Sequence, residues 1–154
     1  MATPYRPLEE PSGPKASIAS DVGALVLRIV VALCTIHHGL QKAQNPEGFA
    51  TGMVAKWFPF LPSPLFWTYL ATTVELVGPA LLILGVFTRS AAFVLFATMC
   101  FANAFHFELT GFEKFPTGVP PGGAYAFEPS LLCGGCFFYL MCAGPGLFAL
   151  VPRF

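Results

Sequence analysis

The sequence PLFWTYLATTVELVGPALLIL, residues 64–84, decides the fold of this chain. As an α-helix it would extend about 30 Å, which matches the hydrocarbon core of a lipid bilayer. One acid, Glu75, stands near its middle, and an ionisable group at that depth costs several kcal/mol unless another segment supplies a partner. We therefore predict that the stripe carrying this acid faces the other helices. At helical periodicity the stripe comprises Thr68, Thr72, Glu75, Gly78 and Gly85.

The composition of the whole chain is that of an integral membrane protein. Of its 154 residues, 55% are hydrophobic and 10% are charged, whereas about a quarter of a soluble protein is charged. Basic and acidic residues balance at 8 each and form no block, which excludes nucleic acid as a partner. The 5 cysteines lie in apolar segments, where they resemble small hydrophobic residues and do not fix the redox compartment.

The order of apolar and broken segments predicts an all-α fold, an integral membrane four-helix bundle. Residues 1–20 form a proline-rich N-terminal tail with little apolar surface, and residues 21–154 form the transmembrane domain. Ser20 or Asp21 is the expected N-cap of the first helix. The predicted spans are 22–41, 64–84, 90–109 and a fourth that opens at Glu128.

The connections carry their own signals. Residues 43–63 are broken by proline and glycine and contain aromatic residues typical of a membrane interface, so we predict a short interfacial segment. Residues 110–127 predict an extended aromatic loop. Four spans place both termini on one side, and a small excess of lysine and arginine there favours termini inside. The residues do not distinguish an organelle inner membrane, a thylakoid membrane and a plasma membrane.

Counting depth along each helix predicts a buried ion pair between Arg28 and Glu75. From the terminal side, the arginine would lie about 9 Å and the acid about 14 Å into the membrane. An arginine side chain can reach across that difference. The pair would fix the register of the helices, and the alternatives are a proton relay or an anchor for substrate.

A second layer of polar residues is expected near the opposite face, within about 10 Å of the boundary by the same count. The histidines could instead be hydrogen-bonded packing residues, a metal site or pigment ligands, but no metal-ligand spacing is present and we predict no metal. CGGC, residues 133–136, has the spacing of a dithiol pair, although its glycines also permit close helix packing. We expect both thiols to stay reduced. The candidate cavity comprises His38, Lys42, Asn103, His106, Glu128, Cys133 and Cys136.

Several short motifs, taken in order, resemble those of DoxX-like membrane proteins. They are LVLRIVVAL, HHGLQK, ELVGPALLILGVFTR, NAFH, FEPSLL and the final GPG. The resemblance implies a four-helix bundle, and its members are similar to the membrane subunits of thiosulfate:quinone oxidoreductase. CGGC is not part of the family pattern. It resembles the CxxC of vitamin K epoxide reductase-like bundles, but their loop cysteine pair is missing. The characteristic positions carried over are Arg28, His38, Gly39, Lys42, Glu75, Gly78, Arg89, His106 and Glu128.

Two functions follow from this resemblance and from the long tail and loops, which exceed a minimal bundle. The first is an accessory subunit of a larger redox or photosynthetic membrane complex, contributing packing and lipid or pigment contacts. The alternative is a quinone-linked membrane oxidoreductase component of the thiosulfate:quinone type, with a cavity at His38, His106 and Glu128. The expected partners are membrane lipids and other membrane subunits. A quinone, a lipid or a pigment are the candidate cofactors, and no catalytic residue is assigned.

Overall fold

The computed structural model describes residues 17–112 and 114–151, and within them all regular structure is helical. The all-α prediction is therefore confirmed. Most of the predicted tail, residues 1–16, lies outside the described residues. The helices are α1 (Ile18–Gln44), α2 (Pro46–Phe49), a π-helical turn η1 (Ala50–Val54), α3 (Ala55–Trp57), α4 (Pro64–Leu84), α5 (Thr88–Thr110) and α6 (Glu128–Ala143).

Three of these helices, α1, α4 and α5, are long and apolar enough to cross a membrane. The fourth, α6, is apolar but has 16 residues, or about 24 Å of helix, which is less than the thickness of the hydrocarbon core. The chain is thus a multi-pass integral membrane protein, and its described residues contain three full-length spans and one shorter apolar helix. The fourth predicted helix opens at Glu128 as expected, and its short length follows from its end at Ala143, before Gly144.

Helix α1 begins earlier than predicted. Ser17, and not Ser20 or Asp21, is the N-cap, and its hydroxyl accepts a hydrogen bond from the backbone N–H of Ser20 at 3.2 Å. A serine in this position satisfies one of the free N–H groups of the first turn. Residues 18–20, assigned to the tail by composition, therefore belong to the helix. At its other end α1 continues to Gln44, past the predicted end at residue 41.

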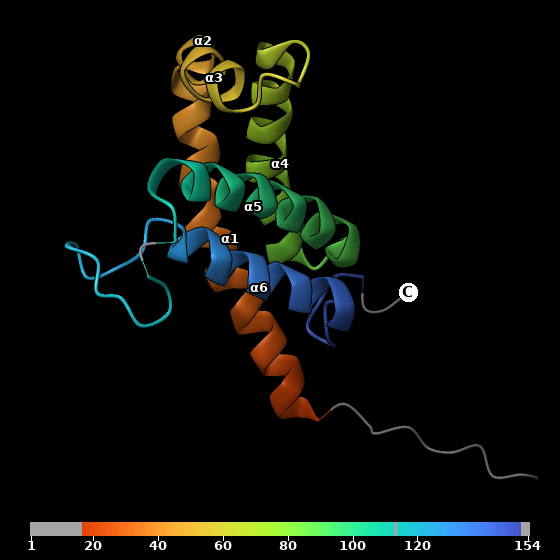
Figure 1. Cartoon of the computed structure of the whole chain (residues 1–154). Coiled ribbons are helices and arrows are strands. Elements are labelled where there is room, and N and C mark those ends of the chain that lie inside the picture. Colours follow the sequence, from red (N-terminus) through yellow and green to blue (C-terminus); the bar gives the residue numbers. More distant parts are fainter. Residues whose placement is uncertain (1–16, 113, 152–154) are drawn as a thin grey trace, which may run out of the picture.

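The helices form two pairs. Helices α1 and α4 lie side by side, α5 and α6 lie side by side, and the second pair crosses the first (Figure 1). The core lies where the pairs meet, and its members include Val31, Leu82, Leu95, Phe137 and Leu140. Many large apolar side chains on the outer faces are exposed, as expected for surfaces that contact lipid.

The polar stripe predicted on α4 faces the other helices. Thr68, Thr72, Glu75 and Gly78 are all buried. The two threonine hydroxyls donate to carbonyls one turn earlier, at 3.0 and 2.8 Å, so they need no partner from another helix. This leaves Glu75 as the group on the stripe that requires one.

The end of α4 is set by a glycine. Gly85 adopts a left-handed conformation with φ of 70°, and its N–H bonds the carbonyl of Leu82 while the N–H of Val86 bonds that of Leu81. This is the Schellman arrangement that satisfies the last carbonyls of a helix. Helix α5 then starts at Thr88, close to the predicted residue 90.

The connection between α1 and α4 contains short helical turns where an interfacial segment was predicted. Trp57 packs edge to face on Phe105 of α5, with ring centroids 5.5 Å apart, and Phe58 packs similarly on Phe101 at 5.6 Å. Its aromatic residues therefore attach the connection to α5. The loop after α5 is closed by a second aromatic cluster around Phe127, which is 1% exposed.

Candidate functional site

A buried ion pair joins the two helices of the first pair. Lys42 Nζ of α1 lies 2.6 Å from Glu75 Oε2 of α4, and the two side chains are 11% and 4% exposed. Lys42 also lies 3.4 Å from the carbonyl of His38, one turn earlier in its own helix. A charged pair enclosed between apolar helices has lost its hydration, so its members depend on each other.

Two residues, Gly39 of α1 and Pro79 of α4, shape the backbone next to the pair. Gly39 lets the helices approach, because a methyl group there would lie 2.9 Å from Leu76 and 3.1 Å from the carbonyl carbon of Glu75. Pro79 lies inside α4 and has no N–H, so the carbonyl of Glu75, four residues earlier, loses its helical partner. The acid thus sits at a point where α4 has a close neighbour and where the carbonyl of Glu75 lacks the N–H four residues later.

Histidines surround the pair. The rings of His37 and His38 lie 4.0 Å apart, and His38 is within electrostatic range of Lys42 and of His106 on α5. The Nδ1 atom of His106 is buried without a hydrogen-bond partner. On its other side, Lys42 Nζ lies 4.9 Å from the centre of the Phe49 ring. The site therefore combines one carboxylate, one ammonium group and three imidazoles.

The predicted pairing of Arg28 with Glu75 is wrong. Arg28, which is fully buried, instead donates to the carbonyl of Leu82 at 3.2 Å and to that of Phe148. The depth count assumed that both helices start at one boundary. In the structure Arg28 is level with the end of α4 while Gly39 is level with Glu75, so arginine and acid lie about 15 Å apart along the axis.

Arg28 and two other charged residues hold backbone atoms near the C-terminus. Asp21 Oδ1 accepts a hydrogen bond from the N–H of Leu147 at 3.0 Å. Arg89 donates to the carbonyls of Met141 and Cys142 at the end of α6, at 3.1 and 2.7 Å. These contacts attach α6 and the following segment to α1, α4 and α5. We interpret them as structural.

The remaining members of the predicted cavity are spread over several places. The Ser130 hydroxyl donates to Asn103 Oδ1 at 2.8 Å, linking α5 to α6, and Glu128 accepts from the backbone N–H of Tyr125 at 3.2 Å, inside the loop. Cys133 and Cys136 are partly buried free thiols. Of the predicted set, Lys42 contacts Glu75, and His38 lies within electrostatic range of Lys42 and of His106.

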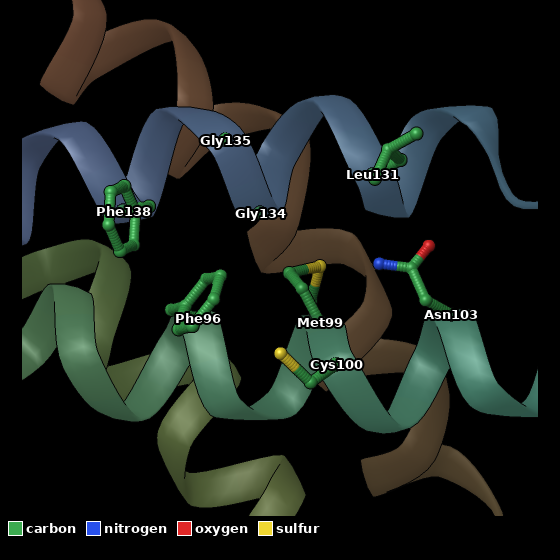
Figure 2. A pocket seen from close by; sticks show the side chains of 8 residues that line it. All are labelled: Phe96, Met99, Cys100, Asn103, Leu131, Gly134, Gly135 and Phe138. Carbon is green, nitrogen blue, oxygen red and sulfur yellow. The ribbon is translucent and has the colours of Figure 1, made fainter.

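Asn103 also lines a groove of about 360 Å³ between α5 and α6. Figure 2 shows its amide at one end, with Phe96 and Phe138 toward the other and Gly134 and Gly135 along α6. The glycines of CGGC thus contribute to the wall of an apolar groove. No group of three or more metal-ligating side chains occurs within residues 17–112 and 114–151.

The sequence did not predict Lys42 as the partner of Glu75, and it suggested Asp21 only as a helix N-cap, not as the acceptor for the segment after α6. The spacing of Gly39 and Lys42 was an available signal, because residues three apart share a helix face and a glycine there marks close packing. Asp21 carried no such signal, since its partner is a backbone N–H distant in the chain.

Comparison with known proteins identifies the group to which these features belong. The DoxX family model matches residues 23–108, which include Lys42, Glu75 and His106. This chain belongs to the DoxX family. The predicted resemblance is thereby confirmed, and the ion pair of this DoxX protein lies inside the matched region.

Two relatives of this DoxX protein are informative. An "Uncharacterized protein" of Haemophilus influenzae is 39% identical over 130 residues, covering 83% of this chain and 87% of the relative. "Putative oxidoreductase CatD" of Bacillus subtilis is 34% identical over 77 residues. That match covers 50% of this chain and about half, 53%, of the relative's length. No solved structure matches this chain.

Proposed function

We propose that this DoxX protein is the membrane-embedded subunit of a redox assembly, and that Lys42 and Glu75 exchange protons in it. The observation that carries the proposal is their buried ion pair. Ionisable residues within membrane helices are expensive to keep and commonly mark paths of protons, ions or substrates. The name of the Bacillus subtilis relative supports redox chemistry as the setting.

The chemistry of the pair suits proton exchange. A carboxylate and an ammonium group in contact can pass a proton between them, and both become neutral when they do. Three histidines lie around the pair, and imidazole exchanges protons near neutral pH. The exposed imidazoles of His37 and His38 would connect the enclosed pair with the surroundings of the helix end.

The proposal that this protein is a subunit is supported by the apolar side chains that remain exposed on its described helices. Their apolar outer faces offer surface for lipid and for neighbouring membrane subunits. No metal-ligand cluster capable of carrying electrons occurs among the described residues. In this proposal a partner redox subunit carries the electrons.

Neutralising the pair tests this proposal. Lys42→Met with Glu75→Leu replaces both charges by apolar groups, which is often neutral or stabilising for a buried pair, whereas either single change strands a charge. If the pair acts in proton exchange, the double variant will be as monodisperse as wild type but will not restore redox activity in membranes lacking the native copy. Restoration to wild-type rates would show that the pair is structural.

The subunit proposal has its own measurement. Tagged wild-type protein extracted in mild detergent is expected to give a larger hetero-complex by native mass spectrometry, and the double variant should retain that partner. Migration of wild type only as a homo-oligomer would overturn the assignment as a subunit.

The second candidate, a quinone-linked site, is favoured by His106. Its buried Nδ1 has no partner, and a quinone carbonyl would accept a hydrogen bond from an imidazole N–H, so the residue fits such a head group. A bound quinone would supply an acceptor of two electrons and two protons. His106 would orient its carbonyl, and Lys42 and Glu75 would hold protons close by.

Photolabelling distinguishes this candidate from the general proposal. An azido-quinone should label wild-type protein near α5, and labelling should fall at least fivefold in His106→Leu but not in His37→Leu, its matched control. Equal labelling of the two variants would exclude His106 as the head-group ligand.

A further inference from the structure

A second groove lies where the interfacial connection meets α5. Its volume is about 520 Å³. Unlike the groove between α5 and α6, it is walled mainly by aromatic rings and includes an acid. Its lining includes Trp57, Phe58, Phe60, Phe101, Phe107 and Glu108.

The rings stand at right angles to one another instead of forming a stack. The plane of Phe58 makes an angle of 89° with Phe60 and of 79° with Phe101, at centroid distances of 6.1 and 5.6 Å. Trp57 is held by Phe105 at an angle of 83°. Perpendicular rings face different directions, and we call the groove that these rings line the aromatic box.

The electrostatics of this box favour a cation. Aromatic faces carry negative potential, and the Glu108 carboxylate adds a formal negative charge at the same groove. Trp57 already attracts one cation, because Lys56 Nζ lies 5.1 Å from its ring centre. Lys56 is not among the lining residues, so among the residues that line the groove Glu108 is the charged one.

The chemical class of the ligand follows from these walls. Small metal ions and primary ammonium groups are strongly hydrated, and five aromatic rings cannot replace their water. A quaternary ammonium group is weakly hydrated and bulky, and aromatic boxes with a nearby carboxylate suit it. We propose that this groove binds a quaternary ammonium group, carried by a choline lipid or by a soluble amine.

The position of the groove agrees with a head-group ligand. Trp57, Phe58 and Phe60 belong to the aromatic connection between two spans, and Glu108 lies in the last turn of α5. Tryptophan and charged residues near helix ends sit at the level of lipid head groups. A lipid could thus place its trimethylammonium group in the box while its chains lie along α5.

Tryptophan fluorescence provides a direct readout. The chain has 2 tryptophans, so Trp67→Phe leaves Trp57 as the reporter. In maltoside micelles, tetramethylammonium chloride should change the emission of Trp57 saturably. Sodium chloride at equal ionic strength and the nearly isosteric neutral alcohol 2,2-dimethylpropan-1-ol should not. An equal response to the ion and the isostere would overturn the proposal.

Two substitutions locate the response. Glu108→Gln removes the charge and keeps the shape, and Phe101→Leu removes a ring and keeps apolar volume. Each should weaken the apparent affinity by about fivefold or more. Glu47→Gln and Phe93→Leu, which change an exposed acid and an exposed ring elsewhere, should not. If both groove variants bind as wild type does, the site is not this groove.

Reconstitution identifies the source of the group. In nanodiscs of phosphatidylglycerol the ammonium response should persist. In nanodiscs of phosphatidylcholine it should be reduced at least fivefold, because the lipid head group competes. A response that is equal in both lipids would retain the ammonium site and assign it to a soluble amine.

Discussion

Gly85→Ala should destabilise this protein more than any ordinary surface substitution, because three structural elements meet at this residue. A methyl group on Gly85 would lie 2.8 Å from the Cα atom of Ala149 and would overlap Nη1 of Arg28. The residue also has φ of 70°, a conformation that L-residues other than glycine rarely adopt. Alanine must therefore displace either the arginine or the C-terminal segment.

The expected decrease in the free energy of unfolding is the sum of two contributions. A left-handed conformation costs an alanine about 1–2 kcal/mol. Displacing Arg28 from the carbonyl of Leu82 loses a hydrogen bond to a charged donor, worth about 1.5–3 kcal/mol. The free energy of unfolding should therefore fall by roughly 2.5–5 kcal/mol.

Unfolding by sodium dodecyl sulfate in mixed micelles, followed by circular dichroism, measures this difference. Gly23→Ala is the matched control, since a methyl group there meets nothing within 4 Å and alanine favours a helix. If the two variants agree within about 0.5 kcal/mol, the proposed clash at Gly85 is refuted. Adding Arg28→Met to Gly85→Ala should cost less than the sum of the single changes, because methionine leaves room for the methyl group.

Three other outcomes are expected. Phe127→Ala should lower the free energy of unfolding by about 3–5 kcal/mol and expose the loop before α6 to limited proteolysis, whereas Phe93→Ala, on a 57% exposed side chain, should do neither. Cys133 and Cys136 should react slowly with a water-soluble maleimide in the folded protein; rapid labelling that oxidation abolishes would contradict this. Lys42→Arg should preserve folding but reduce redox activity to the level of the uncharged double variant, and full activity would count against proton exchange.

The sequence was most informative where a helix carries its own boundary signals. Helix α4 has the predicted bounds because Pro64 suits a first helical turn and Gly85 suits the left-handed residue that ends a helix. The buried stripe on α4 followed from periodicity alone. These features depend on residues near one another in the chain, so local physical chemistry suffices to predict them.

The position of one helix along another was not predictable in this way. The depth count gave α1 and α4 a common starting level, but α1 begins at Ile18 and extends past the end of α4, where the segment after α6 packs against it (Figure 1). This offset depends on the close contact at Gly39 and on backbone acceptors at Leu82 and Phe148. Neither is visible in residue spacing.

Counting depth along the helices also explains why the residues of the predicted cavity do not line one space in the structure. Residues at the same depth in the membrane can point in different directions around their helices. Depth also does not determine which helices pack against each other. Glu128 turns into its own loop and Asn103 bonds Ser130, whereas His106 faces the first helix pair. Two of the three therefore lie outside the ion-pair site, although all were expected to line one space.

The partner of Glu75 is Lys42 and not Arg28, and this difference changes the chemistry that the buried acid can perform. An arginine stays protonated in proteins, so in a pair of Arg28 with Glu75 only the acid could have exchanged a proton. Lysine can release its proton when it is enclosed. Asp21 and Arg28 bond backbone atoms, as does Arg89. Among the described residues, Lys42 and Glu75 thus form a buried ion pair in which each member can both gain and lose a proton. For this reason we propose proton exchange at this pair.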